Sequence, residues 1–312
     1  MLIMQDLDRM LAGVADGFAH VGDVRAPVLR HPSDVGLVYE DVTFPALDGV
    51  PLEGWFIPAE GTDRLVIANH PMGFSRSGQP TDRSPWRDEW GPSGNGVEVD
   101  FLPDYRILHD AGYHVLAYDL RNHGLSGAAH GGIVTSGWLE SRDVVGSIRH
   151  ARQRADLAGV RIALFSRCLG CNSTMAAMQR YPEEFDGISC LVGAQPVTTR
   201  IIVGHQLQLA GVPADRVEQA LTDLDGLVRL RTSFGWSDRD NHEWAKSVSV
   251  PTLLYQVHDD VLTEPTDVQT QFDNIPVADK SLHWITGTTA RWDGYLEFQR
   301  RPEPMLAWID AH

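Results

Sequence analysis

Hydrophobic and polar positions alternate along the first part of the chain in the manner of extended strands. Val38 to Phe44 alternates with a period of two, Leu47-Asp48-Gly49 favours a turn, and Leu52 to Ile57 has the composition of a returning strand. Arg64 to Asn69 is a short apolar run with little alternation, which is typical of a strand that is buried on both sides. We therefore expect an antiparallel hairpin followed by a buried strand.

From residue 101 onwards, segments of helical period alternate with apolar strand segments. The predicted helices are Phe101 to Ala111, Trp138 to Arg154, the segment after Cys168, Thr266 to Asn274, and Pro302 to His312. The predicted strands are Tyr113 to Tyr118, Ile162 to Ser166, Ile188 to Val192, Thr252 to Val257, and Ser281 to Ile285. This alternation favours an α/β fold with a parallel sheet, right-handed crossovers and helices on both faces.

Two segments interrupt this rhythm, and they suggest how the chain is divided. Residues 74–100 are rich in Gly, Pro, Ser and Trp, and a connection of that length without secondary structure is often functional. Residues 198–249 carry only polar helical patterns, so we interpret them as a small helical lid. The expected organisation is an N-terminal helical extension (1–36), a core (37–197 and 250–312) and the lid inserted into it.

The segment from Ile162 to Asn172 carries the strongest chemical signal. It runs from a buried strand into a helix through a turn of small residues, with Cys168 at its tip. A nucleophile held in such a turn requires small residues two positions before and after it, and Ser166 and Gly170 satisfy both requirements. A thiol at the first turn of a helix faces the positive end of the helix dipole, which favours the thiolate. Alternatively, Cys168 is simply a small buried hydrophobic residue.

Composition and charge limit the classes of partner. The 312-residue chain is 43% hydrophobic and carries a net charge of −16, which argues against nucleic acid or an anionic membrane and for a small-molecule substrate. No apolar run approaches the roughly 18–20 residues that span a bilayer, and Met1 to His20 has the pattern of an amphipathic helix rather than a secretion signal. Three cysteines make no even disulfide framework, so we expect a cytoplasmic protein. We expect no metal and no cofactor, and a homo-oligomer remains open.

The order of these motifs resembles the α/β-hydrolase superfamily from about Val38 to the end of the chain. The elbow Ser-x-Cys-x-Gly at 166–170, the Asp-x-Arg-x-His-Gly-x-Ser stretch at 119–126 and the acid loop at 258–263 follow in the order of that superfamily. The cysteine at the elbow and the loop His70-Pro71-Met72-Gly73 are similar to the dienelactone-hydrolase-like branch. The resemblance implies an α/β-hydrolase fold with a mostly parallel eight-stranded sheet.

The resemblance also implies roles for individual residues. Asp260 occupies the position of the catalytic acid, and its neighbour Asp259 is the weaker choice. The oxyanion hole would use the N–H groups of Leu169 and Met72, since Pro71 has no N–H, with Gly73 as an alternative to Met72. His70 is expected to anchor its loop rather than to act as a base.

The chain departs from the superfamily where the catalytic histidine belongs. The loop after the last strand, Gly287 to Tyr295, contains no histidine. Three interpretations follow: another histidine, His258 or His283, fills the role; Cys168 works as a thiolate held by the helix dipole and Arg291; or the fold binds a ligand or catalyses a non-hydrolytic step. Cys168 to Cys171 also has the Cys-x-x-Cys spacing of redox motifs, but the elbow accounts for that spacing.

These observations predict an enzyme that uses Cys168 as nucleophile and Asp260 as acid. Its expected substrate is an ester, thioester or lactone of a hydrophobic small molecule, which is hydrolysed or whose acyl group is transferred. The alternative is a non-hydrolytic or ligand-binding member of the same fold that has lost the histidine.

Overall fold

The structure, a computed structural model, describes residues 4–312 and contains an eight-stranded sheet with strand order β1-β2-β6-β3-β7-β8-β9-β10. The first two strand pairs, β1 with β2 and β2 with β6, are antiparallel, and the remaining pairs are parallel. The strands are β1 (Glu40–Pro45), β2 (Pro51–Ile57), β3 (Arg64–Asn69), β6 (His114–Tyr118), β7 (Arg161–Arg167), β8 (Ile188–Ala194), β9 (Thr252–Val257) and β10 (Lys280–Ile285).

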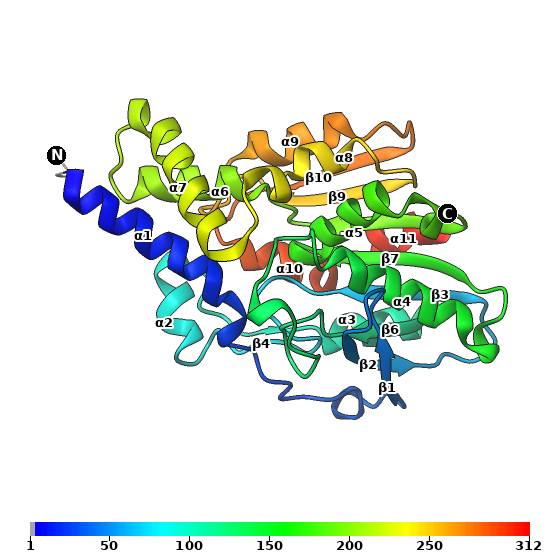
Figure 1. The fold of residues 1–312 in the computed structure, drawn as a ribbon. Helices are drawn as coiled ribbons and strands as arrows, with labels where there is room; N and C mark the ends of the chain where they lie inside the picture. The colour runs from blue at the N-terminus through cyan, green and yellow to red at the C-terminus, as the bar shows by residue number, and fades with distance from the viewer. Residues whose placement is uncertain (1–3) are drawn as a thin grey trace.

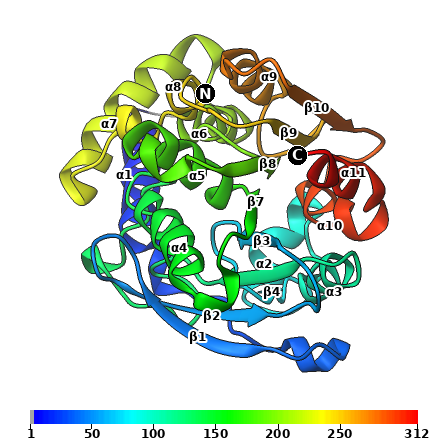
Figure 2. The same ribbon diagram turned by 90° about the vertical axis from the view of Figure 1, so that its right-hand side faces the viewer.

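Helices cover both faces of this sheet, as Figure 2 shows when the molecule is seen along the strands. One face carries α4 (Ser141–Gln153), α5 (Leu169–Arg180), α8 (Asn241–Ala245) and α9 (Pro265–Asn274). The other face carries α3 (Leu102–Asp110), α10 (Arg291–Arg300) and α11 (Glu303–Ala311). The central strands β3 and β7 are almost wholly buried because their apolar side chains face a separate hydrophobic core on each side. The predicted fold class is confirmed.

A third hydrophobic cluster joins the start of the chain to the inserted helices. The amphipathic helix α1 (Met4–His20) packs along α7 (Val217–Thr232), and α6 (Thr199–Leu209) packs on α7 in turn. Figure 1 shows α1 in blue beside α7, away from the main body of the sheet. Phe18 meets the edge of the Trp236 ring with centroids 5.7 Å apart, and Leu11 is buried in the same cluster. The apolar face of α1 is thus buried within the chain itself.

The segment 74–100 is more ordered than its composition predicted. It forms a two-stranded sheet from β4 (Gly78–Gln79) and β5 (Val99–Asp100), with the short helix α2 (Trp86–Trp90) between them. Asn95 accepts a hydrogen bond from the backbone N–H of Trp292 at 2.9 Å, and the Trp292 indole N–H donates to Thr81 at 3.1 Å. Contacts with α10, about 200 residues later in the chain, therefore order this segment, and no local pattern could have predicted them.

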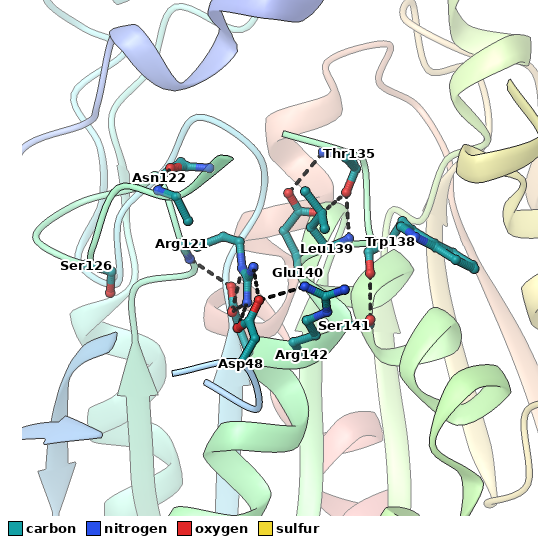
Figure 3. A network of polar contacts seen from close by, with 12 residues as sticks. Asp48, Arg121, Asn122, Ser126, Thr135, Trp138, Leu139, Glu140, Ser141 and Arg142 are labelled. Carbon is teal, nitrogen blue, oxygen red and sulfur yellow. Dashed lines mark hydrogen bonds and ion pairs between the residues drawn. The ribbon is translucent and has the colours of Figure 1, made fainter. Parts of the chain in front are cut away.

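A network of ion pairs around the buried Arg121 holds the loop between β6 and α4 (Figure 3). Arg121 is fully buried and donates to both Asp143 and Asp48, and Arg142 donates to Asp48 at 2.8 Å. The two arginines hold the pKa of Asp48 well below its usual range, against the opposing effect of burial. Glu140 accepts bonds from the backbone and hydroxyl of Thr135 in the same loop. The network fixes the path of residues 121–141.

None of the helices within residues 4–312 is both long and apolar enough to cross a membrane.

Candidate active site

Cys168 lies at the turn between β7 and α5 in a strained backbone conformation. Its φ of +46° and ψ of −109° fall outside the regions that non-glycine residues ordinarily occupy, and such conformations persist mainly at functional sites. Small neighbours make the turn possible. A Cβ atom at Gly170 would come within 2.6 Å of the Asn69 backbone oxygen, so only glycine lets α5 approach β3 this closely. Ser166 accepts a bond from the Asn69 amide at 2.9 Å.

A cavity of about 450 Å³ lies above Cys168, at the carboxyl ends of the parallel strands. This is the edge of an open α/β sheet at which ligands usually bind. Part of the cavity wall comes from α1 and the turn after it, part from α6, and part from α2, with Trp86 and Trp90. The start of α10 also contributes to it. The residues that line it are Gly17, Phe18, His20, Val21, Val24, Met72, Gly73, Gln79, Trp86, Glu89, Trp90, Ser136, Cys168, Leu169, Asn172, Val197, Thr199, Ile202, Val203, Leu262, Arg291, Trp292 and Tyr295.

Arg291 and Asp260 form a buried ion pair beside the thiol. Asp260 is 4% exposed and Arg291 is 2% exposed, and Arg291 Nη1 donates to Asp260 Oδ2. Asp260 Oδ1 accepts the backbone N–H of Leu262 at 2.9 Å, which fixes the carboxylate. Burial would lower the pKa of Arg291, but its neighbours Tyr295, Asp260 and Cys168 outweigh burial and raise that pKa well above its usual range. A permanent positive charge therefore stands next to Cys168.

Gln195, at the end of β8, fixes the direction of the guanidinium. Its backbone oxygen accepts a bond from Arg291 Nη2, and its side-chain amide donates to the Arg291 backbone oxygen at 2.7 Å. Its Oε1 atom accepts the Val257 N–H at 2.8 Å, so the amide cannot rotate freely. A Cβ atom at Gly294 would lie 2.3 Å from the Gln195 amide nitrogen, which shows how closely α10 packs on this residue. The sequence analysis missed Gln195, because a polar residue after a buried strand has no distinctive motif.

Tyr295 is the second residue that the sequence analysis missed. Its hydroxyl oxygen accepts the Arg291 Nε–H at 3.0 Å, one helical turn along α10, and its side chain lines the same cavity as Cys168. Burial raises the pKa of Tyr295 well above its usual range, and the thiol of Cys168 adds to that effect while Arg291 opposes it. The sequence analysis expected a loop here, and it is the helix α10 that places Arg291 and Tyr295 one turn apart.

The three histidines considered in the sequence analysis lie outside the cavity lining. His258 is exposed and bonds Asp259 at 2.7 Å, while His283 lies on β10, 3.5 Å from Glu297. His70 is buried, with Nδ1 donating to the Pro71 oxygen and Nε2 accepting the Leu120 N–H. Among residues 4–312, the histidine that does line the cavity is His20 on α1. Its side chain is 67% exposed and bonds Asp23.

The loop expected to supply an oxyanion donor is held on both sides. His70 anchors one end of it through its two ring nitrogens, and at the other end Gln79 Nε2 donates to the Gly73 oxygen at 2.7 Å. Met72 and Leu169 both line the cavity, and Leu169 is the first residue of α5, where the backbone N–H has no partner within the helix. The Gly170 N–H donates instead to the His70 oxygen at 3.1 Å and is not free for a ligand.

His70 leads to a prediction about stability and pH. Burial, followed by the nearby ring of His123, holds the pKa of His70 well below its usual range. Below pH 6.5 the unfolded chain binds a proton at this residue and the folded chain does not, so this part of the stability is lost as pH falls from about 6.5 toward the lowered folded-state value. The slope for one proton is at most about 1.4 kcal/mol per pH unit.

We expect His70→Asn to be less stable than the wild type at pH 7 and the difference to shrink between pH 6.5 and 5. Urea unfolding at each pH measures both proteins. A difference between them that stays constant from pH 6.5 to 5 would contradict the prediction.

Comparison with solved structures shows a shared fold. The chain is similar to an esterase, Pf2001, from Pyrococcus furiosus, with 21% identity, 91% of this chain and 94% of that chain covered, and a TM-score of 0.61. It is similar to an acetyl xylan esterase from Paenibacillus sp. R4 (13% identity, all of both chains covered, TM-score 0.56) and to a dienelactone hydrolase from Anabaena variabilis (14% identity, 88% and 98% covered, TM-score 0.50).

The chain has the α/β-hydrolase fold. No protein-family model matches the chain, and no curated protein matches it in sequence. At these identities the similarity concerns the α/β-hydrolase fold alone, so the chemistry has to be argued from the residues around Cys168.

Within the residues that the structure describes, no group of three His, Cys, Asp or Glu side chains is arranged to hold a metal ion.

Proposed function

We propose that the protein is an α/β-hydrolase-fold enzyme that uses Cys168 as a nucleophile on an ester, thioester or lactone of a hydrophobic small molecule. The observation that carries the proposal is the buried Arg291–Asp260 pair beside the strained Cys168. A fixed guanidinium next to a thiol stabilises the thiolate, which is the reactive form of cysteine. Cysteine tolerates the loss of a histidine better than serine does, because part of it ionises without a base.

In this proposal Asp260 acts on Arg291 rather than on an imidazole. The carboxylate accepts from Nη1 and the Gln195 carbonyl accepts from Nη2, so the guanidinium is oriented by two separate elements of the fold. When the thiolate attacks the acyl carbon, negative charge develops on the carbonyl oxygen. The backbone N–H groups of Leu169 and Met72 are the proposed hydrogen-bond donors to that oxygen.

The residues of the cavity wall favour a substrate whose acyl or alcohol group is hydrophobic and uncharged. Most of the lining side chains are apolar, with Trp86, Trp90 and Trp292 among them. Arg291 is the one Lys or Arg among the lining residues that the structure describes, and Asp260 already pairs with it. A donor with several phosphate groups would find no second cation in the cavity, which favours simple esters and lactones over acyl groups on a highly charged carrier.

The test is intact-protein mass spectrometry after incubation with activated esters and short acyl thioesters of apolar acids. We expect a mass increase of one acyl group on the wild type and none on Cys168→Ala. The matched control is Cys171→Ala, which should still acylate. Burial raises the pKa of the Cys171 thiol, so that thiol remains protonated and unreactive.

Absence of any adduct on the wild type would favour the alternative, a ligand-binding or non-hydrolytic protein of the same fold. One observation favours that alternative specifically: no histidine that the structure describes pairs with Asp260, the expected acid.

A further inference from the structure

Arg291 dictates how the Tyr295 hydroxyl is oriented. The Nε atom of a guanidinium carries one hydrogen and cannot accept, so in the 3.0 Å bond between these residues the phenol oxygen must be the acceptor. The phenol hydrogen is then left for another partner. Because the Arg291 guanidinium is also held by Asp260 and Gln195, it cannot turn away and release the phenol.

The available partner is on the side of Cys168. Tyr295 is 2% exposed and lines the cavity together with Cys168. Hydrogen bonding with Cys168 is one of the causes that raise the pKa of Tyr295, after burial. The ring itself is fixed by packing against Phe74 and Trp292, with ring centroids 5.5 and 5.3 Å away. The hydroxyl thus stands on a fixed ring with its oxygen occupied by Arg291, and its hydrogen is left for Cys168 or for a substrate bound in the same cavity.

We propose that Tyr295 is a catalytic residue that gives a proton to the leaving group and takes one back from water, with Arg291 holding the charge that this leaves on the phenol oxygen. The inference rests on the proposed function of Cys168. It assigns the proton-transfer role of the absent histidine to a tyrosine on α10, at the end of the segment Gly287 to Tyr295 in which the histidine was expected.

The two half-reactions balance. In the first, the Cys168 sulfur forms a bond to the acyl carbon, the bond from that carbon to the leaving oxygen or sulfur breaks, and the leaving atom takes the Tyr295 hydrogen, which gives an alcohol or thiol and a phenolate. In the second, the phenolate accepts a hydrogen from water while the water oxygen bonds the acyl carbon. The carbon–sulfur bond breaks, which releases a carboxylic acid and restores the Cys168 thiolate and the Tyr295 phenol.

The charges around Tyr295 suit this order of steps. Burial and then the Cys168 thiolate oppose ionisation of the phenol, while Arg291 favours it. As the carbon–sulfur bond forms, the negative charge moves from the Cys168 sulfur to the acyl oxygen, while Arg291 remains in place. The phenol therefore becomes easier to ionise during the step in which the leaving group takes its proton, a change that requires no movement of either side chain.

His20 is the competing proton donor, because it also lines the cavity. It lies on α1, is mostly exposed, and has its Nδ1 atom bonded to Asp23 at 2.8 Å. Among the residues that the structure describes, no aromatic ring pairs with that of His20, whereas Phe74 and Trp292 hold the ring of Tyr295. His20→Asn is therefore the matched control variant.

The experiment measures the rate of acylation, from release of the first leaving group, for a series of esters of one apolar acid whose leaving groups differ in acidity, from p-nitrophenol to a simple alcohol. A p-nitrophenolate leaves without a proton and an alkoxide does not. We expect Tyr295→Phe to acylate with the p-nitrophenyl ester at close to the wild-type rate and to lose about 10²–10⁴-fold with the alkyl ester. The acyl-enzyme should also persist longer in mass spectra of this variant.

A merely structural role for Tyr295 would slow all esters by the same factor, since misplacing Arg291 weakens the thiolate whatever the leaving group. Equal loss across the series, no loss at all, or a leaving-group effect that appears in His20→Asn instead would overturn the proposal. Absence of Cys168-dependent acylation in the wild type would overturn the proposed function and this step with it, and that outcome is distinct from the others because it is seen without any change at Tyr295.

Discussion

Replacing Cys168 by serine should leave the protein folded and reduce its turnover of activated esters by about 10²–10⁴-fold. A serine hydroxyl is not ionised near neutral pH and needs a base, and the one histidine that lines the cavity among residues 4–312, His20, is bonded to Asp23. Loss of a base alone is worth about 10²–10⁴ in rate.

Steady-state kinetics measure the turnover of Cys168→Ser, and thermal unfolding shows whether it is folded. Cys190→Ala is the control for a buried cysteine away from the cavity. Cys190 lies on β8 and is buried in the core on one face of the sheet, so its loss should affect stability more than turnover. A serine variant with turnover close to that of the wild type would show that the site holds a general base, and the proposed role of Arg291 would then be wrong.

Replacing Arg291 by glutamine should have the second large effect, on stability as well as on rate. The substitution leaves the Asp260 carboxylate buried without its cation, and breaking a buried ion pair from one side costs about 3–5 kcal/mol. It also removes the positive charge beside the thiolate, and loss of one preorganised electrostatic group costs about 10²–10³ in rate. Urea unfolding and the rate of acylation by a p-nitrophenyl ester measure the two effects separately.

A double variant separates charge from packing. Arg291→Gln combined with Asp260→Asn places two neutral, hydrogen-bonding side chains where the ion pair stood, so much of the lost stability should return while acylation stays slow. If the double variant recovered the rate together with the stability, the guanidinium would be a structural group and would not stabilise the thiolate.

Local sequence patterns were sufficient for the elbow and for the general path of the chain. The spacing of Ser166, Cys168 and Gly170 is a steric requirement of the turn itself, and the structure has the left-handed backbone at Cys168 and the close approach at Gly170 that this requirement implies. The alternation of apolar strands with amphipathic helices likewise depends on short segments. These features could be predicted because they depend on residues that are close in sequence.

The surroundings of the thiol depend on contacts that no local pattern contains. The absence of a histidine between Gly287 and Tyr295 was visible, but its consequence depends on where α10 begins and on how Gly294 lets that helix pack against Gln195. The sequence could not show which element packs on the apolar face of α1, because an amphipathic pattern indicates that a face is buried and not what buries it. The structure shows that α7 covers it.

The position of α1 has a consequence for the order in which the site is assembled. The wall that carries Phe18 is synthesised early, Cys168 follows near the middle of the chain, and Arg291 comes after β10, within the last part of the sequence. During synthesis the thiol therefore exists for some time without its charged neighbour, and α1 exists without the helix α7 on which it packs. Under the proposed function, the reactivity of Cys168 depends on completion of the polypeptide through α10.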